Sequence, residues 1–155
     1  MLYTGKLEST GPAPRLSLYP QDWSETLGGS VLIVDDDLGT GRLLALLIRH
    51  IGHEAAFVES GDQALEYLST HRPDLVILDV MMPGIDGLEV LQRMRADPHT
   101  ADLPVVMFSA LSDPLFRQVA RDKGANDYWV KASLDFRSLE QRLSTFIPPA
   151  HRLPN

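Results

Sequence analysis

Three consecutive aspartates, Asp35, Asp36 and Asp37, directly follow a short apolar run. A fourth aspartate, Asp79, ends another such run. Like charges that lie close together raise one another's pKa unless a cation offsets the repulsion. Mg²⁺ suits this role, because it binds oxygen ligands and needs only one or two carboxylates beside carbonyl, water or phosphate oxygens. If the two runs are neighbouring strands, the sequence therefore predicts that Asp35, Asp36 and Asp79 bind a divalent metal.

Asp37 has a second interpretation, because acidic residues after a strand are often solvated turn residues or helix caps. The apolar residues within 43–51 recur every three or four positions, which is the pattern of a helix that starts shortly after Asp37. An aspartate at that place accepts hydrogen bonds from the unpaired N–H groups of the first turn. We expect Asp37 to be this cap, while the triplet alone leaves metal binding and a solvated turn open.

Two further polar side chains stand at the ends of apolar runs. Ser109 follows residues 105–108, and Lys131 follows residues 128–130. Since ligands of parallel sheets bind beyond the carboxyl ends of the strands, this edge should collect carboxylates, a hydroxyl and an ammonium. A metal and an ammonium neutralise the charge of a phosphoryl group, and a hydroxyl donates a hydrogen bond to it. The set can therefore hold a metal and a phosphoryl group together.

Short apolar runs alternate with helical patterns from residue 31 onward, which is typical of parallel βαβ units. The expected strands are residues 31–34, 54–58, 75–78, 105–108 and 128–130. The expected helices lie around residues 43–51, 64–68, 88–94, 115–120 and 136–146, and Pro148 and Pro149 should end the last one. The connections are long enough for right-handed crossovers. The sequence thus predicts an α/β fold, a doubly wound five-stranded parallel sheet with helices on both faces.

The composition bounds the class of protein. The chain has 155 residues, of which 44% are hydrophobic and 23% charged, as expected for one globular domain. Its net charge of -7 argues against direct nucleic-acid binding. Without cysteine it has neither disulfides nor thiolate metal sites, which fits a reducing compartment. We see no apolar run long enough for a membrane span and no signal peptide, so we expect a cytoplasmic protein without membrane insertion.

Residues 1–30 differ from the rest, since prolines and a Gly-Gly pair interrupt any regular spacing of apolar residues. We expect an N-terminal arm that is partly disordered, as unanchored termini commonly are. The alternative is an arm that docks on an apolar face through its leucines and Trp23. The folded domain is expected over residues 31–147, and a C-terminal tail over residues 148–155.

Four motifs at the expected strand ends resemble those of the receiver domain of two-component response regulators, and the likeness spans residues 31–147. They are VDDD after the first strand, LDVMMPGIDG around Asp79, FSA with Ser109 and YWVKA with Lys131. The resemblance implies a flavodoxin-like, doubly wound sheet with strand order 2-1-3-4-5 and five helices. It also implies a phosphorylation switch of the chemotaxis-regulator type, which acts as a single domain or as a piece of a longer protein.

The resemblance assigns the metal and phosphoryl chemistry residue by residue. Asp79 matches the aspartate that accepts a phosphoryl group from the phosphohistidine of a histidine kinase or histidine phosphotransfer protein. Asp36 and Asp79 match direct ligands of Mg²⁺ or Mn²⁺, and the main-chain carbonyl of Met81 matches a further ligand. Asp35 matches the acid that acts mainly through metal-bound water. Such a domain assists its own phosphorylation and dephosphorylation, so we expect a regulator and not an enzyme.

Four more residues have implied roles in phosphoryl binding and switching. Lys131 matches the lysine that pairs with the phosphoryl oxygens, and Ala110 the small residue that leaves room for them. Ser109 matches the switch hydroxyl, and Tyr128 the aromatic residue that moves inward with it. The implied output surface surrounds Tyr128 and is made by the fourth helix, the fifth strand and the fifth helix. A downstream protein or a second copy of the chain would bind there.

Three apolar residues near this surface have two interpretations each. Trp129 is either an ordinary core residue of its strand or part of the surface. Leu115 and Phe116 are expected first on the core face of their helix and second on a surface for a partner.

One departure from the family pattern concerns the residue after Lys131. The family usually has a proline there, often preceded by a cis peptide bond, whereas this chain has Ala132. A cis bond before alanine costs about 3 kcal/mol. We therefore expect a trans bond and a different placement of the Lys131 ammonium.

Two rival functions remain open. A phosphatase of the haloacid-dehalogenase type would use Asp35 as nucleophile within an Asp-x-Asp motif with Asp37, but Thr40 stands one residue too late for that motif. The other rival is a binding module that keeps the receiver fold and signals without phosphate. In the phosphatase the phosphorylated residue is Asp35, and in the receiver it is Asp79.

Overall fold

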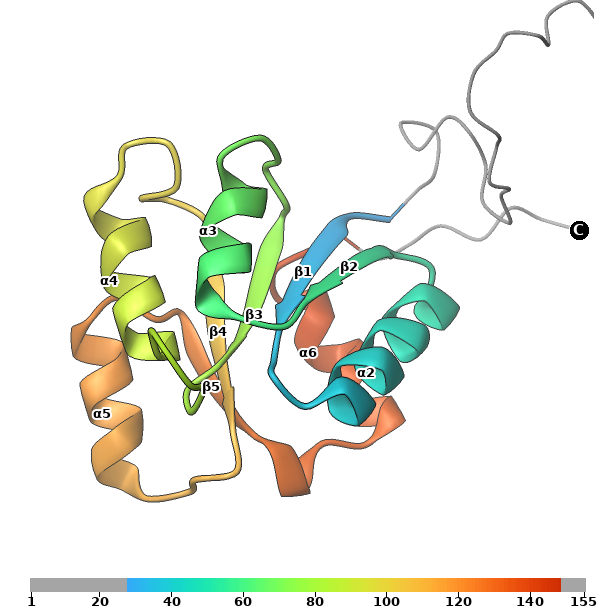
Figure 1. The fold of residues 1–155 in the computed structure, drawn as a ribbon. Coiled ribbons are helices and arrows are strands. Elements are labelled where there is room, and N and C mark those ends of the chain that lie inside the picture. The colour runs from blue at the N-terminus through green and yellow to red at the C-terminus, as the bar shows by residue number, and fades with distance from the viewer. Residues whose placement is uncertain (1–27, 149–155) are drawn as a thin grey trace, which may run out of the picture.

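Five parallel strands form one sheet in the order β2-β1-β3-β4-β5 (Figure 1). The computed structural model describes residues 28–148. Its strands are β1 (Ser30–Val34), β2 (Glu54–Val58), β3 (Leu75–Asp79), β4 (Val105–Ser109) and β5 (Asp127–Val130). The predicted doubly wound sheet with strand order 2-1-3-4-5 is confirmed, and each strand end lies within one residue of its predicted place.

Five α-helices in the described part of the chain cover both faces of the sheet. They are α2 (Leu38–Ile51), α3 (Gly61–Leu68), α4 (Gly87–Ala96), α5 (Pro114–Asp122) and α6 (Phe136–Ser144), and a short 3₁₀ helix, η2 (Lys131–Ser133), precedes the last. Buried residues of α3, α4 and α5 share one apolar cluster with the sheet. Those of α2 and α6 share the other (Figure 1). The helices are thus divided between the two faces, as predicted.

Local sequence explains where the first and last helices begin and end. Asp37 caps α2, because its side chain accepts hydrogen bonds from the N–H groups of Gly39 and Thr40, and this prediction is confirmed. The prediction that the two prolines end α6 is wrong, since the helix ends at Ser144. Beyond the helix, the N–H groups of Phe146 and Ile147 both bind the carbonyl oxygen of Leu143, and Ile147, which is only 1% exposed, belongs to the same apolar cluster as α6.

The apolar pattern predicted the buried side of the sheet better than that of the helices. Trp129 is 1% exposed, which confirms that it is a core residue. Leu115 and Phe116 are 65% and 37% exposed, so the expectation that they lie on the core face is wrong. The reason is that α5 buries only Ala120 fully and leaves its first turn in solvent. Leu43, in the apolar pattern of α2, is likewise exposed.

The predictions for the two ends of the chain lie largely outside the described residues. Of the arm predicted over residues 1–30, only residues 28–30 are described, and most of the tail predicted over 148–155 lies outside as well. Among the described residues, none of the helices has the length and apolar character that a membrane span requires.

Arg95 at the end of α4 ties together the loops at the amino end of the sheet. Its guanidinium donates hydrogen bonds to carbonyl oxygens of Leu103 at 2.8 Å, Gly124 at 2.9 Å and Ala101 at 3.1 Å. It also donates to the side-chain oxygen of Asn126 at 3.0 Å. Arg95 is partly buried, and removing a partly buried donor leaves carbonyl oxygens that depend on it without a hydrogen bond.

We predict that Arg95→Met lowers the free energy of unfolding by about 2–4 kcal/mol, because a side chain of similar length removes the donor that these three carbonyl oxygens share. The side-chain oxygen of Asn126 keeps a second donor, the N–H group of Val105 at 2.8 Å. The matched control is Arg93→Met on the same helix, which removes one exposed ion pair with Glu89 and should cost less than about 1 kcal/mol. Urea unfolding monitored by circular dichroism measures both values. Equal losses in the two variants would contradict the prediction.

Candidate functional site

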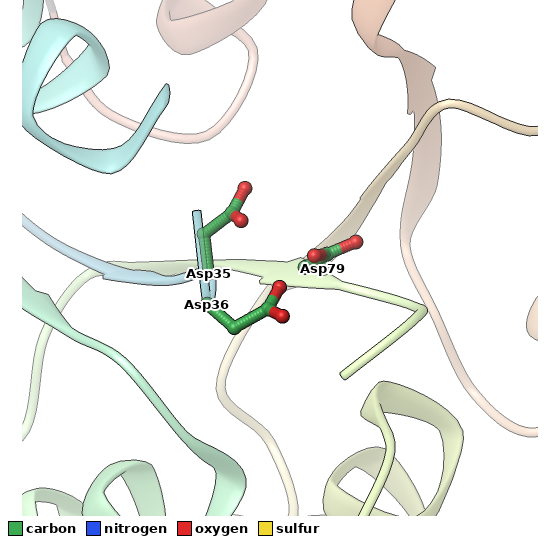
Figure 2. A group of neighbouring side chains, drawn as sticks. All are labelled: Asp35, Asp36 and Asp79. Carbon is green, nitrogen blue, oxygen red and sulfur yellow. The ribbon is translucent and has the colours of Figure 1, made fainter. Parts of the chain in front are cut away.

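The acidic cluster forms because β1 and β3 are neighbours with matched ends. Val34 pairs with Leu78 in the sheet, so Asp35 and Asp79 follow at the same edge. Carboxylate oxygens of Asp35, Asp36 and Asp79 all lie within 4.8 Å of one another (Figure 2). The structure therefore brings together the three acids that the sequence analysis selected for a metal site.

Burial makes this cluster electrostatically costly. Asp35 is fully buried and Asp79 is 5% exposed, whereas Asp36 is exposed to solvent. Burial, followed by repulsion from Asp35, raises the pKa of Asp79 to about 7. The N–H group of Met81 and the Lys131 ammonium act in the opposite direction, but they do not compensate fully. A carboxylate in this state favours any ligand that brings positive charge.

Lys131 supplies positive charge from the end of β5. Its Nζ lies 2.8 Å from Oδ2 of Asp35 and 3.6 Å from Oδ2 of Asp79. Burial lowers the pKa of this ammonium, but the hydrogen bond to Asp35 and the two carboxylates together raise it above its ordinary value. The peptide bond to Ala132 is trans, as expected, since residues 28–148 contain no cis bond. The ammonium nevertheless reaches the acidic cluster.

Backbone groups fix the orientation of the two buried carboxylates. Oδ1 of Asp79 accepts from the N–H group of Met81 at 3.2 Å, and Oδ1 of Asp35 accepts from that of Asp37 at 2.9 Å. Gly87 starts α4 against this loop, and a Cβ atom there would lie 2.0 Å from the main-chain oxygen of Asp79. Position 87 therefore requires glycine. The sequence shows the second glycine of PGIDG, but only the structure shows the close approach that explains it.

Ser109 ends β4, the strand beside β3, and Tyr128 lies on β5, the next strand of the sheet. Ser109 is fully buried and its Oγ accepts from the N–H group of Leu111 at 3.0 Å. Tyr128 is 4% exposed and its hydroxyl donates to the carbonyl oxygen of Leu111 at 2.8 Å. One residue, Leu111, therefore connects the two side chains through its main chain. Sequence reasoning missed this link because main-chain groups carry no residue-type signal. Ala110, between Ser109 and Leu111, is exposed.

The residues at this edge fit a hard divalent cation. Mg²⁺ binds oxygen ligands at about 2.0–2.1 Å in an octahedron, so its ligand oxygens lie roughly 3–4 Å apart. The three carboxylates have oxygens close to this spacing. One oxygen of Asp35 is already paired with Lys131. Asp36 and Asp79 are therefore the better placed direct ligands, while Asp37 is committed to capping α2.

Comparison with known proteins agrees with this geometry. A curated relative, the transcriptional regulatory protein AfsQ1 of Streptomyces coelicolor, is 37% identical over 123 residues, which are 79% of this chain and 53% of that protein. The chain spans about half the length of the curated relatives it matches, several of which are described as DNA-binding response regulators.

Solved structures share the fold. A response regulator from Chloroflexus aurantiacus superposes with a TM-score of 0.72 at 36% identity, over 76% of this chain and 96% of that one. The receiver domain of sensor histidine kinase PA1611 from Pseudomonas aeruginosa, described with a magnesium ion in its active-site cleft, has a TM-score of 0.70. It covers 77% of this chain and 97% of that one, and at 24% identity it shows the fold alone. Residues 31–144 match the response regulator receiver domain, and the chain therefore belongs to that family.

Proposed function

We propose that Asp79 is the residue of this receiver domain that accepts a phosphoryl group, from the phosphohistidine of a histidine kinase or a histidine phosphotransfer protein. The observation that supports it best is the convergence of three carboxylates and the Lys131 ammonium at one edge of the sheet. Asp79 is the member of this cluster that is buried, oriented by a backbone N–H group and not tied to Lys131 at short range. The proposal makes the chain a regulator in the cytoplasm rather than an enzyme.

The reaction needs positioning more than covalent chemistry from the protein. A carboxylate oxygen of Asp79 forms a bond to phosphorus, the P–N bond of the phosphohistidine breaks, and its electron pair returns to the imidazole. Lys131 lies close enough to stabilise the charge on the phosphoryl oxygens. Mg²⁺ or Mn²⁺, held by Asp36, Asp79 and the main-chain carbonyl of Met81 and reached by Asp35 through water, would reduce the repulsion between two anions.

The signal should leave through the surface formed by α5, β5 and α6. Tyr128 of β5 connects to the site through Leu111 and Ser109. Leu115 and Phe116, exposed on the first turn of α5, give this surface apolar residues for a downstream protein or for a second copy of the chain. Our expectation that nucleic acid is not a direct partner gains no support from the relatives, which are described as transcriptional regulators.

The phosphatase alternative is less well supported by the geometry. Asp35 is bound to Lys131 at 2.8 Å. The side chain of Asp37 accepts from the N–H groups of α2 and from the hydroxyl of Thr40 at 3.0 Å. In an Asp-x-Asp motif one aspartate is the nucleophile and the other is the acid, and both must face the same substrate. Asp35 and Asp37 are each engaged by other groups and do not have this arrangement. A phosphate-independent binding module remains the alternative that the following experiment separates.

Intact mass spectrometry after incubation with acetyl phosphate and Mg²⁺ tests the proposed function. We expect one added phosphoryl group on the wild-type chain and none on Asp79→Asn, because only Asp79 has the required surroundings. The matched control, Asp37→Asn, should be phosphorylated like the wild type, since asparagine also caps helices. Phosphorylation that persists in Asp79→Asn and disappears in Asp35→Asn would instead support the phosphatase, and none at all would support the binding module.

The raised pKa of Asp79 predicts a pH-dependent effect of Mg²⁺ on stability. In the metal-free protein, folded Asp79 keeps a proton between about pH 4 and 7 that the unfolded chain releases, so stability falls as the pH rises through this window. Metal binding must displace this proton. We therefore expect Mg²⁺ to raise the Tm by several degrees at about pH 8 and hardly at all at about pH 5.5.

Two variants make the Mg²⁺ measurement specific. Asp36→Asn should remove most of the Mg²⁺ effect at the higher pH, because it deletes an exposed ligand without disturbing the ion pair of Lys131. Asp37→Asn should retain it. Differential scanning calorimetry at both pH values decides the matter, and a Mg²⁺ effect of the same size at both would show that Asp79 does not titrate as described.

The exposed leucines of α2 predict where a phosphohistidine donor docks. Leu43 and Leu46 are 56% and 61% exposed on the helix that begins just after the aspartate triplet. We expect Leu43→Glu combined with Leu46→Glu to slow transfer from a phosphorylated histidine kinase at least tenfold, at an unchanged rate with acetyl phosphate. The control is Leu115→Glu on α5, which is 65% exposed. Equal slowing with both donors would show damage to the site instead of lost docking.

A further inference from the structure

Arg117 of α5 reaches across to β5 and makes two contacts with one residue, Tyr128. Its Nη1 donates a hydrogen bond to the main-chain oxygen of Tyr128 at 3.1 Å. Its guanidinium carbon also lies 5.1 Å from the centroid of the Tyr128 ring, within the range of a cation–π interaction. Arg117 therefore holds both the backbone and the ring of this tyrosine.

The position of Arg117 on its helix is unusual for a charged residue. It precedes Ala120, the only fully buried residue of α5, by three positions, so both lie on the side of the helix that faces the sheet. An arginine on this side loses part of its hydration and needs a partner. Among the ion pairs of residues 28–148 none involves Arg117. Its recorded partner is Tyr128.

The nearby acid, Asp127, makes no ion pair with the guanidinium among the ion pairs of residues 28–148. Asp127 accepts from the N–H group of Tyr128 at 2.8 Å with one oxygen and from Nε1 of Trp129 at 3.0 Å with the other. Both oxygens of Asp127 are therefore used within β5. This arrangement leaves Arg117 directed at the ring and the carbonyl of Tyr128.

Tyr128 in turn leads back to the phosphorylation site. Its hydroxyl binds the carbonyl oxygen of Leu111, whose N–H group donates to Ser109. Ser109 ends β4, the neighbour of the strand that carries Asp79. A set of contacts thus runs from Ser109, on the strand next to that of Asp79, through Leu111 and Tyr128 to Arg117 on α5.

We propose that Arg117 is a positioning residue that holds Tyr128 in its buried orientation before phosphorylation, so that this receiver is biased toward its signalling conformation. This inference rests on the proposed function, because it assigns a regulator to the surface through which that function signals. A residue that binds one orientation better than the other shifts the equilibrium between them by its differential affinity. Phosphorylation would then complete a change that Arg117 has already favoured.

The test follows the orientation of Tyr128 by ¹⁹F NMR of the full chain labelled with 3-fluorotyrosine. The chain has four tyrosines, and loss of one resonance in Tyr128→Phe assigns the signal. In the metal-free protein we expect Arg117→Ala to reduce the ratio of buried to exposed Tyr128 by about tenfold. Mg²⁺ with beryllium fluoride, an acyl phosphate mimic, should restore the buried orientation. A merely structural loss would not be restored in this way.

Two further variants keep the inference falsifiable. Arg121→Ala removes the same charge from an exposed position one turn further along α5 and should leave Tyr128 as in the wild type. Arg117→Lys keeps the charge without the planar group, so it should shift the ratio in the same direction but less. If Arg117→Ala does not fold, Arg117→Lys decides between the outcomes. An unchanged Tyr128 signal in the Arg117 variants, or an equal shift in Arg121→Ala, overturns the proposal.

Failure of the proposed function would have a different signature. Without a phosphorylation site, Mg²⁺ and beryllium fluoride would not restore the buried orientation of Tyr128 in Arg117→Ala. The comparison of metal-free wild type with Arg117→Ala needs neither ligand and still decides whether Arg117 holds Tyr128.

Discussion

The rest of the structure depends on the repulsion between two buried carboxylates at the edge of an apolar sheet. Asp35 and Asp79 have almost no exposed surface, and the Lys131 ammonium between them offsets their charge only in part. Burial of like charges costs stability that well-packed apolar residues would not cost. Such an arrangement instead favours the binding of cations and supports phosphoryl transfer. Carboxylates with perturbed pKa values are for this reason concentrated at functional sites.

Parallel strands explain why so much of the site could be predicted from the sequence. Residues that directly follow short apolar runs must lie at one edge of such a sheet, so Asp35, Asp79, Ser109 and Lys131 were recognisable from their spacing alone. Strand order was a different matter, because periodicity does not say which strands are neighbours. Only the resemblance to receiver domains placed β1 beside β3 before the structure did, and that neighbour relation brings the two acids together.

What could not be predicted involves main-chain groups and helix faces. Leu111 has an apolar side chain, yet its N–H and carbonyl groups join Ser109 to Tyr128. The sequence alone indicates that Arg117 is a solvated residue of an amphipathic helix. In the structure it lies on the side of α5 that faces the sheet, because the helix packs on the sheet with Ala120. The same packing exposes Leu115, which periodicity assigned to the core. A helical period fixes which residues share a face, and tertiary contacts decide how much of that face is covered.

The hydroxyl of Tyr128 gives a physical reason for two discrete states at the output surface. A phenol has an apolar ring and one O–H group, which needs an acceptor whenever it is buried. Inside the core its recorded acceptor is the carbonyl of Leu111, and outside it the acceptor is water. An orientation that offered neither acceptor would leave the hydroxyl unpaired, which favours two discrete states over gradual movement. Ser109 acts on this choice through Leu111 and Arg117 acts on it through the ring, which makes their effects on Tyr128 separable.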